Sequence, residues 1–294
     1  MIHQSSGIEG YLLDLDGTVY LGESLIEGAG CAIEKLRARG RKIAFLTNKP
    51  LHSRGNYAEK LTNLGVPASE DDVVTSSYVL ARYLAENSPG ARVFAIAEEP
   101  LLVELRDAGL VLTDVPEEIE YVVAAFDRTF DYRKLDIGFQ ALRRGAHFIA
   151  TNPDRTCPVE NGEIPDAAAV IAALEATSQK EVETVVGKPS THMTQAGLGR
   201  LGVPAERAAI IGDRLETDVA MGLNGGIVAI LTLSGVTTRD ILNGSRIKPD
   251  YVIESLAELP TLDERFETGT RTDDQQHKLL RSVVRTCTRA NGHQ

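Results

Sequence analysis

The feature that most constrains the fold is a regular alternation of strand and helix patterns at the start of the chain. Two apolar runs predict strands, and the segment after each has helical spacing; these four segments are residues 10–17, 28–40, 41–48 and 53–65. The alternation returns late in the chain, with strand-like patterns at 181–188 and 207–213. Strands separated by helices form a parallel sheet covered on both faces. The sequence therefore predicts an α/β fold with a doubly wound parallel sheet.

A long segment separates the early strands from the late ones. About 140 residues lie between Asn48 and Lys188, whereas connections inside a compact domain are typically about 4–6 residues long. This segment carries its own alternating strand and helix patterns. We therefore expect an inserted α/β cap domain at 83–183, and a discontinuous core domain at 1–82 and 184–265.

Composition excludes several classes of function. The formal net charge of −11 disfavours a nucleic-acid partner, because phosphate backbones are held mainly by clustered Lys and Arg. The three cysteines are far apart and lack a CxxC spacing, so neither a disulfide framework nor a zinc site is indicated, and a reducing cytoplasm is expected. No run of about 18 apolar residues predicts a membrane span. Residues 266–294 are polar and locally basic, and we expect a poorly ordered tail there.

Polar side chains follow the predicted strands where those strands end. They are Asp14 and Asp16 with the turn residue Gly17, then Thr47 and Asn48, then Lys188, then Asp213. In open parallel sheets, ligands bind beyond the carboxyl ends of the strands. Paired carboxylates suit Mg²⁺, and they also suit a reaction in which one acid attacks while the other transfers protons. A lysine and a threonine can neutralise and hydrogen-bond phosphate oxygens, so the set predicts phosphoryl transfer.

Two other motif interpretations fail on their spacing. An EF-hand loop starting at Asp14 would need Gly at the sixth position and Glu at the twelfth, where Val19 and Leu25 stand. The GxGxxG pattern at 197–202 follows a helical stretch instead of a strand, so it predicts no dinucleotide-binding loop. We interpret Gly202 as the end of that helix.

The ordered motifs resemble those of the haloacid dehalogenase (HAD) superfamily of phosphatases over roughly residues 8–262. The motifs are Asp14-Leu15-Asp16-Gly17-Thr18, Thr47-Asn48, Lys188-Pro189, and Gly212-Asp213-Arg214 with Asp218. The large insertion between the second and third motifs contains the stretch at 149–158. It is similar to the subgroup with a large α/β cap, which includes NagD-type, AraL-type and p-nitrophenyl phosphatases.

The resemblance implies roles for single residues. Asp14 would be the nucleophile, and Asp16 would protonate the leaving oxygen before activating water. Thr47 and Lys188 would hold the phosphoryl group.

The resemblance also implies a metal site and a substrate site. Mg²⁺ would be bound by Asp14, the Asp16 carbonyl and Asp213, with Asp218 supporting the metal shell. The residues facing the substrate would be Gly17, Asn48, Lys49 and, in the cap, Asn152.

The sequence thus predicts a Mg²⁺-dependent phosphatase that hydrolyses phosphomonoesters of small metabolites, such as sugar phosphates, through an aspartyl-phosphate. The resemblance adds a possible homodimer through the cap. Two alternatives remain open: a phosphotransferase using the same intermediate, and a non-catalytic sensor of phosphorylated metabolites. The presence of Asp16 argues against the sensor, because binding alone has no use for a proton donor.

Overall fold

The structure, a computed structural model, describes residues 7–159 and 162–268. Packing divides the chain into two compact units, each of which is described by itself. The first unit comprises the described residues of 1–46, 58–73 and 194–294, and the second those of 47–57 and 74–193. The domain boundaries expected from the sequence stay a prediction, because units defined by packing need not coincide with domains.

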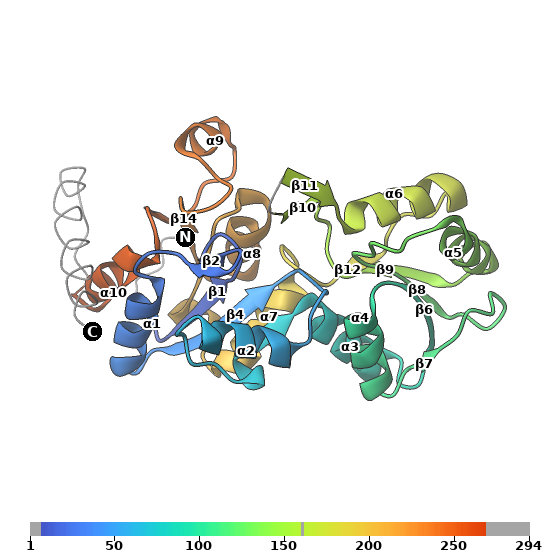
Figure 1. Ribbon diagram of the computed structural model, residues 1–294, viewed down its shortest axis with the longest axis horizontal. Helices are drawn as coiled ribbons and strands as arrows, with labels where there is room; N and C mark the ends of the chain where they lie inside the picture. The colour runs from blue at the N-terminus through green and yellow to red at the C-terminus, as the bar shows by residue number, and fades with distance from the viewer. Residues whose placement is uncertain (1–6, 160–161, 269–294) are drawn as a thin grey trace. The chain divides into compact units, whose positions relative to one another are not determined.

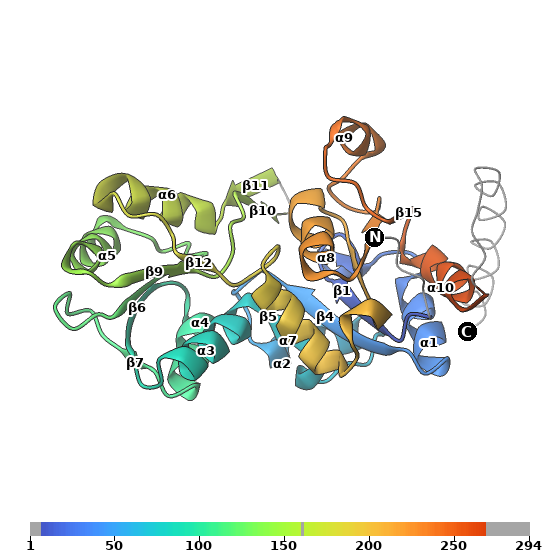
Figure 2. The ribbon, with the colours of Figure 1, turned by 180° about the vertical axis from the view of Figure 1, so that it is seen from behind.

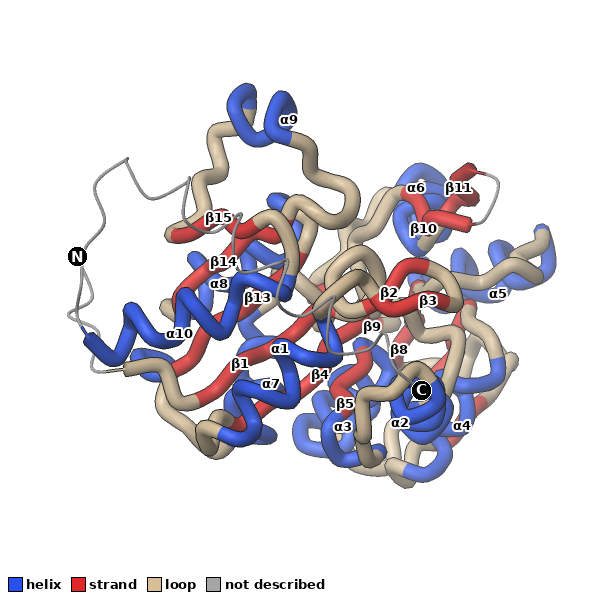
Figure 3. The backbone as a smooth tube through the Cα atoms, turned by 60° about the vertical axis from the view of Figure 1, so that its left-hand side comes forward, coloured by secondary structure: helices blue, strands red, loops and turns tan. Residues whose placement is uncertain are grey.

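The main sheet has six strands, in the order β15, β14, β13, β1, β4, β5. Their bounds are Tyr251–Ile253, Val228–Thr232, Ala208–Gly212, Gly10–Asp14, Lys42–Thr47 and Val73–Thr75. β1 pairs in parallel with both β13 and β4, and Figure 3 shows these three strands side by side. The chain proceeds outward from β1 through β4 to β5, and later from β13 through β14 to β15. The strand order therefore reverses between β1 and β13, which is the switch point where doubly wound sheets bind ligands.

Helices cover both faces of this sheet. They are α1 (Ala29–Ala38), α2 (Arg54–Asn63), α7 (Thr191–Leu201), α8 (Ala220–Gly225) and α10 (Leu259–Thr268). Helix α9 (Arg239–Gly244) protrudes away from the sheet and has no buried residue. Figure 1 shows α1 and α2 in front of the sheet, and Figure 2, seen from behind, shows α7 and α8 in front. All five residues of β1 are buried, as expected for a strand covered on two faces. The short strands β2 (Tyr20–Leu21) and β3 (Ser24–Leu25) form a hairpin after β1.

The second unit has a five-stranded sheet, in the order β12, β9, β8, β6, β7, whose paired strands are all parallel. The strands are Thr184–Val185, His147–Ala150, Tyr121–Ala124, Arg92–Ile96 and Val111–Leu112. The helices are α3 (Ser76–Asn87), α4 (Glu99–Asp107), α5 (Tyr132–Arg144) and α6 (Ala167–Ser178). Strands β10 (Thr156–Val159) and β11 (Gly162–Pro165) form an antiparallel hairpin. Ile96, Phe148 and Leu174 pack in the core of this unit.

The α/β class and the doubly wound sheet predicted from the sequence are confirmed. The GxGxxG pattern lies largely within α7, and Gly202, with φ 60°, follows the end of that helix as expected. Helix α10 continues to Thr268, with Phe266 buried, so the first three residues of the expected tail are helical. The rest of that tail lies outside the described residues.

One strand predicted from the sequence belongs to the sheet of the second unit. The strand-like pattern before Lys188 is realised only as β12, and β12 pairs with β9 of the second unit instead of joining the main sheet. Local periodicity indicates a strand but does not identify its partner, because pairing depends on residues distant in the sequence.

Candidate active site

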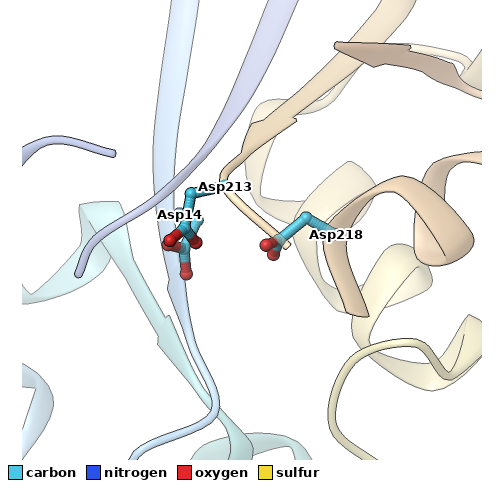
Figure 4. A group of neighbouring side chains, drawn as sticks. All are labelled: Asp14, Asp213 and Asp218. Carbon is cyan, nitrogen blue, oxygen red and sulfur yellow. The ribbon is translucent and has the colours of Figure 1, made fainter. Parts of the chain in front are cut away.

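Three buried carboxylates gather at the switch point of the main sheet. Asp14 is the last residue of β1 and Asp213 directly follows β13, and the two strands are paired through Leu13 and Ile211. One carboxylate oxygen each from Asp14, Asp213 and Asp218 lie within 4.8 Å of one another. Figure 4 shows the Asp14 and Asp213 carboxylates close together and that of Asp218 pointing toward them. All three residues are at most 7% exposed.

Glycines make the space for these carboxylates. A Cβ at Gly235 would lie 2.0 Å from Asp213 Oδ2, and a Cβ at Gly17 would lie 2.4 Å from the same atom. Gly17 also has a φ of 83°, a conformation that side chains disfavour. A Cβ at Gly212 would lie 2.1 Å from Asp218 Cγ. The backbone therefore approaches the acids more closely than any other residue type allows.

Backbone donors hold two of the three acids. The N–H of Val236 donates to Asp213 Oδ2 at 2.6 Å. Asp218 lies in a single π-helical turn, Leu215–Val219, and its Oδ2 accepts from the N–H of Arg214 at 3.1 Å. Both hydrogen bonds come from backbone N–H groups, and carboxylate oxygens are the ligands that hard divalent cations prefer.

Asp16 lies in the turn after Asp14. The carbonyl of Leu15 accepts hydrogen bonds from the N–H groups of Thr18, Val19 and Tyr20, which closes the turn. Asp16 is partly exposed, unlike the three clustered acids, and its carboxylate does not belong to their group. The turn therefore separates the two acids of the first motif, one buried beside Asp213 and one partly open to solvent.

Five other predicted site residues, Thr47, Asn48, Lys49, Asn152 and Lys188, belong to the second unit. Thr47 ends β4, is 3% exposed, and accepts a hydrogen bond from the N–H of Lys49 through Oγ1 at 3.1 Å. Lys188 is also 3% exposed.

The side-chain amide of Asn48 binds the main chain of Lys188. Its Oδ1 accepts from the Lys188 N–H at 2.8 Å, and its Nδ2 donates to the Lys188 carbonyl at 3.1 Å. The same Nδ2 donates to Asp154 Oδ2 at 3.0 Å. Both amide hydrogens of Asn48 thus have acceptors within the protein, and a substrate contact through them would require an exchange of hydrogen bonds.

Asn152 is completely buried beside two acids. Its Nδ2 donates to Asp154 Oδ2 at 3.0 Å and to Asp166 Oδ1 at 3.1 Å. Burial raises the pKa of the Asp166 carboxyl above its ordinary value, and the nearby Asp154 adds to this, while hydrogen bonds from the Ala167 N–H and Asn152 oppose it. Asp154 and Asp166 are not among the site residues predicted from the sequence. The local signal for Asp154 is its place after a proline in a strand-end turn.

A doubly wound sheet with three buried carboxylates at its switch point has the arrangement of an α/β enzyme, and these acids offer oxygen ligands suited to a divalent cation. A model described as haloacid dehalogenase-like hydrolase matches residues 11–111, and a HAD-hydrolase-like model matches residues 185–259. The chain belongs to the haloacid dehalogenase-like hydrolases and, within them, to the NagD-like phosphatase subgroup. It is thus a HAD-type phosphoric monoester hydrolase, as the sequence predicted.

Relatives with known names support this assignment. The sugar-phosphatase AraL of Bacillus subtilis is 40% identical over 87% of this chain and 93% of its own. The 5′-nucleotidase YutF of the same organism is 34% identical over 85% of this chain and 96% of its own. The solved structure of a 4-nitrophenylphosphatase from Thermotoga maritima superposes with a TM-score of 0.83 at 37% identity, covering 86% of this chain and 97% of its own.

Among the residues that the structure describes, none of the helices has both the length and the apolar character of a membrane span.

Proposed function

We propose that this enzyme hydrolyses phosphomonoesters of small metabolites, with sugar phosphates as the leading class, through an aspartyl-phosphate on Asp14. The observation that carries the proposal is the group of three buried carboxylates at the switch point. The similarity to a named sugar phosphatase at 40% identity favours sugar phosphates over nucleotides, whose named relative is 34% identical.

In the first step, a carboxylate oxygen of Asp14 attacks phosphorus and forms a P–O bond while the ester P–O bond breaks. Asp16 gives its proton to the departing alcohol oxygen. Its place two residues after Asp14, in the turn that follows β1, supports this role, because a general acid must lie within hydrogen-bond reach of the reacting group. In the second step, Asp16 takes a proton from water, and the water oxygen attacks phosphorus. The P–O bond to Asp14 breaks, which releases the Asp14 carboxylate and inorganic phosphate.

The remaining predicted residues bind the substrate. Thr47 and Lys188 hold oxygens of the transferred phosphoryl group and offset its charge. Gly17, Asn48, Lys49 and Asn152 face the substrate in this proposal.

The proposed cofactor is Mg²⁺. The donor set fits this ion, because it offers buried carboxylate oxygens within 4.8 Å of one another, and Mg²⁺ prefers oxygen ligands. Asp14, Asp213 and the Asp16 carbonyl would hold it, with Asp218 supporting them. When bound, it supplies positive charge that allows an anionic nucleophile to approach an anionic phosphate.

We also propose a cytoplasmic location and a homodimer through the cap. The three cysteines are far apart in the sequence and lack a CxxC spacing, which fits a reducing compartment. The dimer rests on the family resemblance and is tested by light scattering of the purified chain.

The test measures phosphate release from p-nitrophenyl phosphate and from a panel of sugar phosphates and nucleotides, with Mg²⁺ and with a chelator. We expect turnover only with the metal, and higher kcat/KM for sugar phosphates than for nucleotides. Asp14→Asn should abolish turnover and prevent the protein phosphorylation that we expect to trap by acid quenching of the wild type. Lys188→Ala should raise the barrier by about 2.7–4 kcal/mol, by analogy with the loss of one preorganised oxyanion donor.

Two results would redirect the proposal. Transfer of phosphate to an added alcohol in preference to water would identify a phosphotransferase. Tight binding of a sugar phosphate without turnover, under varied metals and pH, would identify a sensor.

A further inference from the structure

The main chain at Lys188 is hydrogen-bonded to the side chain of Asn48. β12 ends at Val185, and the ladder to β9 is continued by the Val186 N–H and by the Gly187 N–H, which donates to the Thr151 carbonyl at 2.7 Å. At Lys188 the Asn48 amide takes over, pairing with both the N–H and the carbonyl. The Asn48 side chain thus makes the two main-chain hydrogen bonds that a neighbouring strand would make at this residue.

This contact leaves little room for adjustment. A Cβ at Gly187 would lie 2.3 Å from the Thr151 carbonyl oxygen and 2.6 Å from Asn48 Oδ1. The chain therefore lies directly against both groups, and a change in the Asn48 amide must be transmitted to Lys188.

Asp154 and the Lys188 main chain together set the orientation of the Asn48 amide. An amide turned by 180° would set its oxygen against the Asp154 carboxylate and its NH₂ against the Lys188 N–H, so both contacts would become repulsive. A carboxylate accepts hydrogen bonds and does not donate them, so Asp154 admits one orientation only. Asp154 Oδ2 accepts one hydrogen bond from Asn48 Nδ2 and one from Asn152 Nδ2, each at 3.0 Å.

Asp154 is itself anchored. Asn152 donates to it and to Asp166, while Asn152 Oδ1 accepts from the Thr151 hydroxyl at 2.7 Å. Asp166 caps the N-terminus of α6 and is 4% exposed. The position of the Asp154 carboxylate is therefore fixed by the end of β9 and the beginning of α6.

We propose that Asp154 is a positioning residue, which sets the place of Lys188 by fixing the orientation of the Asn48 amide. The proposal rests on the phosphoryl-binding role of Lys188 proposed above. Asp154 contacts neither the phosphoryl group nor the reacting atoms in this assignment. Its carboxylate acts on a main-chain segment 34 residues further along the chain, through a side chain 106 residues earlier.

The first test compares the turnover of three variants. Asp154→Ala removes the acceptor and should lower kcat about 10- to 100-fold, since small misplacements of a catalytic group have costs of that size. Asp154→Asn keeps an oxygen acceptor and should recover most of the activity. Asp131→Ala is the matched control: it removes the N-cap acceptor of α5 in the same unit, without contact to Asn48, and should leave kcat unchanged.

A double-mutant cycle separates positioning from general damage. If Asp154 acts through Lys188, Asp154→Ala should have little further effect in a Lys188→Ala enzyme. A full and additive loss of kcat in that background would overturn the proposal, as would wild-type kcat in Asp154→Ala alone.

Amide hydrogen exchange gives a reading that does not depend on turnover. The Lys188 N–H should exchange at least about tenfold faster in Asp154→Ala than in the wild type or in Asp131→Ala, because its acceptor is no longer held. Unchanged protection would overturn the proposal. If Lys188→Ala retained full activity while Asp154→Ala still exposed the Lys188 N–H, the proposed function of Lys188 would have failed and the positioning contact would stand.

Discussion

Gly235 limits how the Asp213 carboxylate can be placed. A Cβ there would meet Asp213 Oδ2 at 2.0 Å, so Gly235→Ala should displace that carboxylate and weaken metal binding about 10- to 100-fold. The concentration of Mg²⁺ that gives half-maximal phosphatase activity measures this effect. Gly244→Ala is the control, because a Cβ at Gly244 meets no atom within 4 Å. Equal Mg²⁺ requirements in the two variants would contradict the prediction.

The protonation state of the Asp166 carboxyl affects the stability of the second unit. Burial raises the pKa of its carboxyl above 3.8, so the folded protein holds this proton more tightly than the unfolded chain does. Stability from this group is therefore complete below about pH 3.8 and is lost as the pH rises through the raised pKa. We expect Asp166→Asn to become more stable relative to the wild type over that interval, as measured by urea denaturation at successive pH values. If the free energies of unfolding of Asp166→Asn and the wild type changed in parallel with pH, the pKa of the Asp166 carboxyl would not be raised.

At the scale of elements, α10 is fastened to the main sheet by a buried acid. Asp263 of α10 is completely buried and accepts hydrogen bonds from the Tyr11 hydroxyl at 2.6 Å and from Arg41 Nε at 2.9 Å. Burial, followed by this hydrogen bond, raises the pKa of Tyr11 well above its ordinary value. The phenol therefore remains a donor to Asp263, and the stability from this contact persists through neutral pH and is lost only above about pH 10.

Removing the acid should loosen this helix. Asp263→Ala leaves Arg41 and the Tyr11 hydroxyl without their buried acceptor, and should lower the free energy of unfolding by about 3–5 kcal/mol. Urea denaturation followed by circular dichroism measures the loss. Glu264→Ala is the control in the next position: its side chain is 59% exposed and pairs with Arg39, so about 0–1 kcal/mol is expected. Similar losses of unfolding free energy in both variants would show that the buried contacts of Asp263 stabilise the protein no more than the exposed ion pair of Glu264 does.

The elements that could be predicted are those whose signal is local. The first strand and helix pairs were expected at 10–17, 28–40, 41–48 and 53–65, and the structure has them as β1, α1, β4 and α2 within a few residues. The strand before Lys188 was recognised, but its sheet was not, because the partner β9 lies about 35 residues away in the sequence.

The residues of the candidate site could likewise be predicted only in part. Motif order identified Asp14, Asp213 and Asp218, and the structure brings these three together. The contacts of Asn48 with Asp154 and Lys188 span 106 and 140 positions and carry no periodic signal, so no pattern in the sequence indicated them. Positioning contacts of this kind follow from the assembled fold and not from local propensity.

At the scale of the whole molecule, the two compact units should respond differently to magnesium. The three clustered carboxylates belong to the first unit, and an ion bound only by folded protein stabilises it by RT ln(1 + [L]/Kd), about 2.7 kcal/mol at 100 times Kd. Hydrogen exchange should therefore show added protection along β13 of the first unit and none along β8 of the second. Sodium chloride at equal ionic strength provides the reference, because it screens charge without occupying the site.

Two variants decide whether the carboxylates cause this stabilisation. Asp213→Asn removes one of the three charges and should abolish the rise in thermal midpoint that Mg²⁺ produces in the wild type. Lys188→Ala changes the second unit and should retain the full rise, even though it loses activity. Because thermal midpoints are measured without substrate, a defect in metal binding is thereby separated from a defect in phosphoryl binding. A rise of equal size in Asp213→Asn would place the ion elsewhere and remove the physical basis of the proposed metal site.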